Sequence, residues 1–128
     1  MLAVFLMLVA SASPQARVVK RPIPQDAKSV IRSVHVAAQA KDYRALKALM
    51  VPEFKWSFGG DSDADQAIEA WKHDQEALRE LSRVTRLRCL FKADTKTIQC
   101  PANSGIYYRA GFTKTAEGWR MSYFVAGD

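Results

Sequence analysis

Two histidines, a run of alternating aspartates and a cluster of arginines are the residues whose types and spacing could do chemistry. His73 follows Glu69 by four residues and precedes Glu76 by three, so a helix would place both carboxylates beside the imidazole. A neighbouring carboxylate orients the ring and favours its charged form, as a general base requires. The same spacing is typical of a solvent-exposed helix face with ion pairs, and we favour that interpretation.

Asp61, Asp63 and Asp65 alternate as the first ligands of a calcium-binding loop do. On that pattern, however, the sixth position is Gln66 where glycine is needed, and the twelfth is a lysine where a bidentate glutamate is needed. Carboxylates at the positive end of a helix are the better explanation. The second histidine, His35, lies beside the apolar stripe of its helix, and two histidines without ordered carboxylates make no metal site. We expect no metal and no cofactor.

The chain is basic overall. It has 128 residues, 48% of them hydrophobic, and a formal net charge of +6, which fits one globular domain and excludes collagen-like or disordered chains. On a strand over 86–92, Arg86, Arg88 and Lys92 would share one face. Such a face could bind an anionic polymer, a phosphate or an acidic partner, although a solvated sheet face is the simpler interpretation. We expect no nucleic acid, because no recognition motif is present.

The two cysteines of the chain, Cys89 and Cys100, flank a predicted turn over 93–96. A turn centred between positions 94 and 95 places the two cysteines opposite each other in a hairpin, close enough for a disulfide. The alternatives are weaker, because a zinc site would need two further ligands and a CxxC redox motif is absent. An oxidising compartment would let this disulfide form.

The N-terminal residues 2–10 form an uncharged apolar run followed by small residues. The run is far shorter than the roughly 20 residues that span a bilayer, but it fits a secretory signal cleaved after Ala12. No lysine or arginine precedes it, and a buried N-terminal helix or strand is the alternative. We expect a signal peptide over 1–12, an extended lead-in over 13–24 and a domain over 25–128. The protein would then be periplasmic or secreted.

Helices are expected in the first part of the domain and strands in the last. Helical spacing of apolar residues predicts a helix over 25–40, a shorter one capped by Asp42 and ended by Pro52, and a long one over 61–81 capped by Asp63. Apolar alternation predicts strands over 54–58, 84–92, 97–100, 105–113 and 119–126. Helices followed by an antiparallel sheet predict an α+β domain.

This order of elements resembles the nuclear transport factor 2-like superfamily. The segments AKDYRALKALMVPEF, WSFGGDSDADQAIEAW and GWRMSYFVAGD look like its helix pair, its strand, turn and third helix, and its closing strand. The resemblance covers most of 25–128 and implies N-terminal helices packed on a strongly bent antiparallel sheet that forms a cone. Members include ketosteroid isomerase, polyketide cyclases, dehydratases, transport adaptors and exported proteins of unassigned role. The resemblance therefore implies a shape with a pocket and no particular reaction.

The pocket that this resemblance implies would be apolar. Its expected lining residues are aromatic: Trp56, Phe58, Trp71, Phe112 and Phe124. The isomerase branch places carboxyl and tyrosine side chains inside the cone, where a neutral acid can donate a hydrogen bond to an enolate. The corresponding candidates here are Tyr43, Asp61, Tyr107 and Tyr108.

These observations lead to one functional hypothesis and two alternatives. We expect an exported domain that binds a small ligand or an envelope partner through its pocket or its basic sheet face. The first alternative is a small isomerase or lyase of the same fold, with an aspartate or His73 as the base. The second is a purely structural or assembly role as a homodimer, since sheets of the superfamily often pair.

Overall fold

The structure is a computed structural model that describes residues 21–58 and 62–127. Its elements are α1 (Gln25–Ala40), α2 (Tyr43–Ala48), β1 (Met50–Lys55), α3 (Ala64–Lys72), α4 (Gln75–Val84), β2 (Leu90–Phe91), β3 (Thr97–Cys100), β4 (Arg109–Thr115) and β5 (Gly118–Val125). The strands form one sheet in the order β1-β5-β4-β3-β2. The predicted α+β class is confirmed, but the sheet is mixed, because β1 runs parallel to β5 while the other neighbours are antiparallel.

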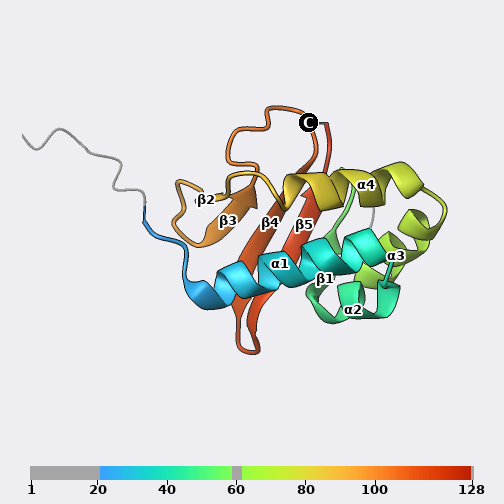
Figure 1. Ribbon diagram of the computed structural model, residues 1–128, viewed down its shortest axis with the longest axis horizontal. Coiled ribbons are helices and arrows are strands. Elements are labelled where there is room, and N and C mark those ends of the chain that lie inside the picture. The colour runs from blue at the N-terminus through green and yellow to red at the C-terminus, as the bar shows by residue number, and fades with distance from the viewer. Residues whose placement is uncertain (1–20, 59–61, 128) are drawn as a thin grey trace, which may run out of the picture.

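Helices α1 and α4 lie side by side across one face of the sheet, and α2 and α3 lie near β1 (Figure 1). The apolar stripe predicted for α1 is the face that it buries, since Ala27, Ile31 and Val34 are all at most 7% exposed. Across the layer, the side chains of Leu81 in α4 and Phe112 in β4 are fully buried. The core therefore lies between this helix pair and the sheet.

Strand β1 begins earlier than predicted. Helix α2 ends at Ala48, and Pro52, which was expected to end it, lies exposed inside β1. Proline is tolerated there because β1 is an edge strand and needs no ladder hydrogen bond on its free side. The pairing with β5 starts where the amide of Met121 donates to the carbonyl of Leu49 at 2.7 Å. Long-range pairing thus decides where this strand starts.

The single long helix predicted over 61–81 is two helices. Asp63 begins α3 by accepting a hydrogen bond from the amide of Gln66 at 3.1 Å, as predicted. Asp74 then begins α4 in the same way, by accepting a hydrogen bond from the amide of Ala77 at 3.3 Å. His73, the residue before it, is the C-cap of α3. An aspartate side chain competes for backbone amides and so favours a new helix start over continuation.

The strand predicted over 84–92 is also wrong in its extent. Amides of Arg86 and Leu87 donate to carbonyls three residues earlier, which continues the chain as helical turns beyond α4. Only Leu90 and Phe91 remain for β2. Arg86, Arg88 and Lys92 are exposed, but they do not share the face of one strand. Arg86 lies in the turns beyond α4, and neither Arg88 nor Lys92 lies within β2.

The predicted hairpin and its disulfide are confirmed. Leu90 pairs with Gln99, which is the predicted register, and the disulfide joins Cys89 to Cys100 with Cα atoms 4.3 Å apart. In the turn, one carboxylate oxygen of Asp94 accepts hydrogen bonds from the amides of Lys96 and Thr97 at 2.9 and 3.0 Å. These bonds stabilise the charged form and lower the pKa of Asp94.

The predicted signal peptide over 1–12 and the first part of the lead-in lie outside the described residues. From residue 21 to 24 the lead-in has no helix or strand and runs against the hairpin. Arg21 donates to the carbonyl of Thr95 at 3.0 Å, and its guanidinium lies 4.7 Å from the centre of the Phe91 ring. Within 21–58 and 62–127, no helix is long and apolar enough to cross a bilayer.

The disulfide should contribute measurably to stability. Replacing Cys100 with serine in a Cys89→Ser background should lower the free energy of unfolding by about 2–3 kcal/mol, because the unfolded chain regains the freedom of a short closed loop. Urea denaturation under oxidising conditions measures this difference. Wild-type protein treated with a reductant is the control and should match the double variant. Equal midpoints for the oxidised wild type and the variant would contradict the expectation.

Candidate functional site

A cavity of about 440 Å³ lies where α3 and α4 approach the ends of β1 and β5. Four of the five predicted pocket residues line it: Trp56, Phe58, Trp71 and Phe124. The fifth, Phe112, does not, because it points from β4 into the main core and is fully buried. Tyr108 and Asp74, which were not among the predicted lining residues, also line the cavity. It therefore combines aromatic walls with a carboxylate and a phenol.

The walls of the cavity are linked by ring contacts. Trp71 of α3 packs edge-on against Phe54 of β1, with ring centres 5.6 Å apart, and against Phe124 of β5 at 5.8 Å. Tyr108 in turn stacks on Phe124 at 5.2 Å. Edge-to-face and stacked pairs have defined geometries, so this row of rings holds the wall in one arrangement.

The outer rim of the cavity is formed by Phe58, whose side chain is 45% exposed. The ammonium of Lys55 lies 5.5 Å from its ring centre, and the guanidinium of Arg109 lies 5.6 Å from it. Arg109 also donates to the carbonyls of Tyr107 and Gly127, at 3.1 and 3.0 Å. Arg109 thus ties the segment before β4 and the C-terminal segment to the rim.

Three polar groups belong to the cavity residues. One oxygen of Asp74 is used to cap α4, which leaves the carboxylate's remaining acceptor capacity for a ligand. Burial raises the pKa of Tyr108, and the negative charges of Asp74, Glu76 and Glu80 raise it further, so the phenol stays a neutral donor. The indole nitrogen of Trp56 is buried and has no hydrogen-bond partner among the described residues.

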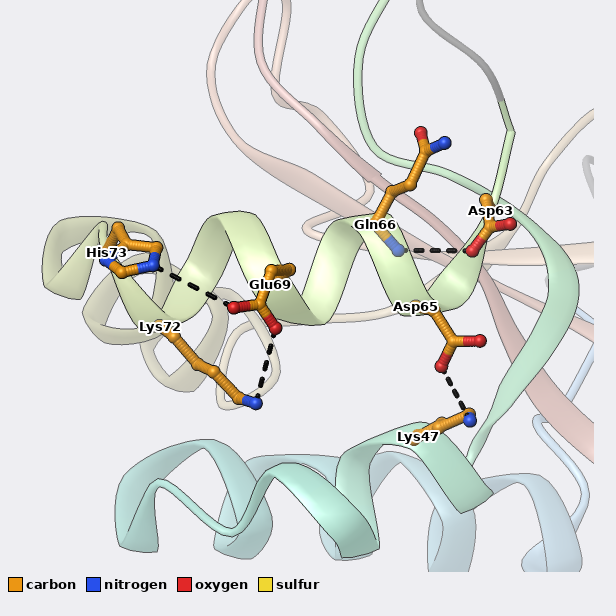
Figure 2. A network of polar contacts seen from close by, with 7 residues as sticks. All are labelled: Lys47, Asp63, Asp65, Gln66, Glu69, Lys72 and His73. Atoms are coloured by element: carbon orange, nitrogen blue, oxygen red, sulfur yellow. Dashed lines mark hydrogen bonds and ion pairs between the residues drawn. The ribbon is translucent and has the colours of Figure 1, made fainter.

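His73 is on the solvated helix face, as favoured from the sequence. Figure 2 shows it at the C-terminal end of α3, beside Glu69 and Lys72. Its side chain is 81% exposed, its Nε2 lies 3.9 Å from a carboxylate oxygen of Glu69, and Lys72 contacts the other oxygen at 3.4 Å. His73 does not line the cavity.

The aspartates at the start of α3 have structural partners. Asp63 caps the helix, and Asp65 forms an ion pair of 2.6 Å with Lys47 of α2 (Figure 2). The hydrogen bond and charge of Asp65 raise the pKa of Lys47. Asp61 lies outside the described residues. Among the residues described, no three His, Cys, Asp or Glu side chains are grouped so as to hold a metal ion.

Of the two adjacent tyrosines, only Tyr108 belongs to the cavity; Tyr107 is 73% exposed. Tyr43, on α2, is half-buried, with the ammonium of Lys72 5.7 Å from its ring centre, and it does not line the cavity either. The sequence interpretation missed Asp74, because it placed this residue in the middle of one long helix. The signal that was present is an aspartate followed three residues later by an apolar helical run, which is a helix start.

Comparison with known proteins gives one structural match. No family model matches the sequence, and no curated protein matches it. A crystal structure described as an NTF2-like protein with a cystatin-like fold, from Novosphingobium aromaticivorans, is similar to this chain at 19% sequence identity. The similarity covers 77% of this chain and 76% of that chain, with a TM-score of 0.44. That description names the superfamily that the sequence resembles, and it says nothing of an activity.

The phenol of Tyr108 should titrate above the usual pH range of a tyrosine, because burial and nearby negative charges raise its pKa. Replacing Asp74 with asparagine should bring the pKa of Tyr108 down while keeping the cap of α4, because the nearby negative charge is lost and asparagine caps as well as aspartate. NMR of ring-labelled tyrosine against pH measures the pKa of Tyr108. Asp63→Asn, at the start of α3, is the control and should leave Tyr108 unchanged. A pKa of Tyr108 that is the same in Asp74→Asn and in wild type would contradict the expectation.

Proposed function

We propose that this protein is an exported ligand-binding domain whose aromatic cavity takes a small, largely apolar molecule. The observation that carries the proposal is that Trp56, Phe58, Trp71, Tyr108 and Phe124 converge on one cavity of about 440 Å³. Ligand sites of small molecules are concave, mostly apolar and supplied with a few polar groups, which is the composition found here. The cavity would be the mouth of the cone that the superfamily resemblance implies.

The polar groups favour a neutral ring compound that carries a hydroxyl or carbonyl group. Tyr108 offers a donor and an acceptor, and Asp74 offers an acceptor. A ligand that leaves these groups without hydrogen bonds would bind more weakly, because the free-energy cost of removing them from water would not be recovered. Aromatic walls suit a flat ring system.

Export is supported by two features. The disulfide between Cys89 and Cys100 persists in an oxidising compartment, and the apolar run at the N-terminus has the length of a secretory signal. We favour the cavity over the basic sheet face as the binding site. Arg86, Arg88 and Lys92 do not form that face, because only two residues of their segment are in a strand.

Binding of 2-naphthol should depend on the hydroxyl of Tyr108. Isothermal titration calorimetry should show that Tyr108→Phe weakens binding by about three- to tenfold, the loss expected for one hydrogen bond. Tyr107→Phe removes an exposed hydroxyl next to it and should change nothing. Naphthalene, which has the same ring and no hydroxyl, should bind wild type more weakly than 2-naphthol does. Failure of both compounds to bind would overturn the proposal.

A second candidate function is an isomerase or lyase acting in the same cavity. The observation in its favour is that a carboxylate and a phenol with a raised pKa line one aromatic cavity. Asp74 would remove a proton next to a carbonyl group, and Tyr108 would donate a hydrogen bond to the enolate oxygen that develops. The base would be Asp74, since His73 is outside the cavity.

Enzymatic proton abstraction has a direct test in deuterium exchange. If Asp74 is the base, the protein should accelerate exchange of the α-protons of 2-tetralone in D₂O, and Asp74→Asn should lower that acceleration at least a hundredfold. NMR of the ketone follows the exchange. Asp63→Asn is the matched control, because it replaces a helix-capping aspartate outside the cavity. Exchange no faster than in buffer would exclude this candidate while leaving the binding function intact.

A further inference from the structure

A second cleft, of about 410 Å³, lies between α1 and the turns that follow α4. It shares no lining residue with the aromatic cavity. Its apolar part consists of Ile31, which is 7% exposed, together with Ile23 and the half-buried Cys89. The cleft is therefore a separate place where an apolar group can leave water.

The charged residues that line this cleft are all cationic. Lys28 and Arg32 are four residues apart and so share one side of α1, and Arg86 faces them from the turn after α4. No carboxylate is among its lining residues. Asp26 lies two residues from Lys28, about 200° round the helix. On α4, Glu80 is already paired with Arg83 at 2.7 Å. The cleft thus has a positive potential with little local compensation.

The walls of the cleft are held in place by the contacts around it. The disulfide fixes Cys89 to β3, and the anchoring of Arg21 on Phe91 and Thr95 fixes the chain next to Ile23. His35, which also lines the cleft, donates from Nδ1 to the carbonyl of Ser82 at 2.8 Å, since a carbonyl can only accept. A cleft with fixed walls binds a ligand at a lower entropic cost than one that must first form.

From this arrangement we propose that the cleft binds an amphiphilic organic anion, that is, a carboxylate or phosphate headgroup attached to a short apolar chain. The two guanidinium groups of Arg32 and Arg86 would hold the headgroup, because planar guanidinium groups pair with such oxygens through two hydrogen bonds. Lys28 would add a point charge. The apolar chain would lie against Ile23 and Ile31, so neither a bare anion nor a neutral chain satisfies both halves of the cleft.

Arg86 extends the positive region further. It also lines an adjacent cleft together with Arg79 and with Arg83, whose guanidinium is paired with Glu80 at 2.7 Å. A headgroup with more than one negative charge could therefore contact Arg79 in addition to Arg86. This favours a phosphate ester over a simple carboxylate when the two carry the same apolar chain.

Sodium octanoate is the probe that tests the proposal. Titration into the full chain should show binding, while 1-octanol and inorganic phosphate should bind at least tenfold more weakly, because each satisfies only half of the cleft. The double variant Arg32→Gln/Arg86→Gln should weaken octanoate at least tenfold. Arg44→Gln/Lys114→Gln, which removes two exposed cations that do not line the cleft, should bind as wild type does.

The two histidines of the chain report where octanoate binds. The ring resonances of His35 should shift on addition of octanoate, whereas those of His73, exposed at the end of α3, should not. Octyl phosphate should bind more tightly than octanoate. Tyr108→Phe should leave both affinities unchanged, which separates this cleft from the aromatic cavity. Octanoate binding that is unaffected by Arg32→Gln/Arg86→Gln, or that leaves His35 unshifted, would overturn the proposal.

The anion could be a free molecule or a membrane lipid, and vesicles distinguish the two sources. Co-sedimentation with phosphatidylglycerol vesicles that is lost in Arg32→Gln/Arg86→Gln would assign the cleft to lipid headgroups. Octanoate binding without co-sedimentation would assign it to a free organic anion. Either result supports the shared chemistry, and absence of both would refute it.

Discussion

The contact on which both the fold and the aromatic cavity depend is that of Trp71 with two strands. From α3, its ring packs edge-on against Phe54 of β1 and Phe124 of β5, and it is only 4% exposed. These are the two strands that pair in parallel at one edge of the sheet. Parallel strands cannot be joined by a tight hairpin, and the chain that connects β1 to β5 begins with α3 and continues through α4 and the other three strands. The ring of Trp71, which contacts both strands, is also a wall of the cavity, so stability and binding depend on the same side chain.

Helix α4 separates two chemically different surroundings. Its first residues lie near the aromatic cavity, where Asp74, Glu76 and Glu80 all act on the phenol of Tyr108. The turns beyond its last residue supply Arg86 to the cationic cleft. Acidic groups at the start of a helix and basic groups at its end are also what the helix dipole favours. The two ends of this one short helix therefore supply a carboxylate to one cleft and a cation to the other.

Much of the fold could be predicted because its signals are local. The spacing of apolar residues in α1, the capping aspartates at 42 and 63, and the register between Cys89 and Cys100 all lie within a few residues of what they determine. The errors concern features that depend on distant residues or on a competition. Pro52 lies in a strand because β1 pairs with β5, far along the chain. The turns after α4 were mistaken for strand because helix continuation and apolar alternation compete there.

The aromatic cavity was predictable in part for the same reason. Alternation around Trp56 and Phe58, and helical spacing at Trp71, identify apolar side chains that must face inward. Whether an inward side chain meets a cavity or the solid core depends on packing, and Phe112 meets the core. Asp74 could be assigned to the cavity only once the helix break was known. The cationic cleft joins residues from α1 and from beyond α4, which no local pattern relates.

The two edges of the sheet limit how the protein can associate. On one edge, β1 contains Pro52, which has no amide hydrogen to offer to an incoming strand. On the other edge, β2 has only two residues, and Cys89, the residue before it, is joined by a disulfide to Cys100 of β3. Neither edge is a good template for strand addition, so continuous sheets across molecules are disfavoured. A second copy of this chain would have to be received on the open face of the sheet or on the helices, through side chains and not through the backbone.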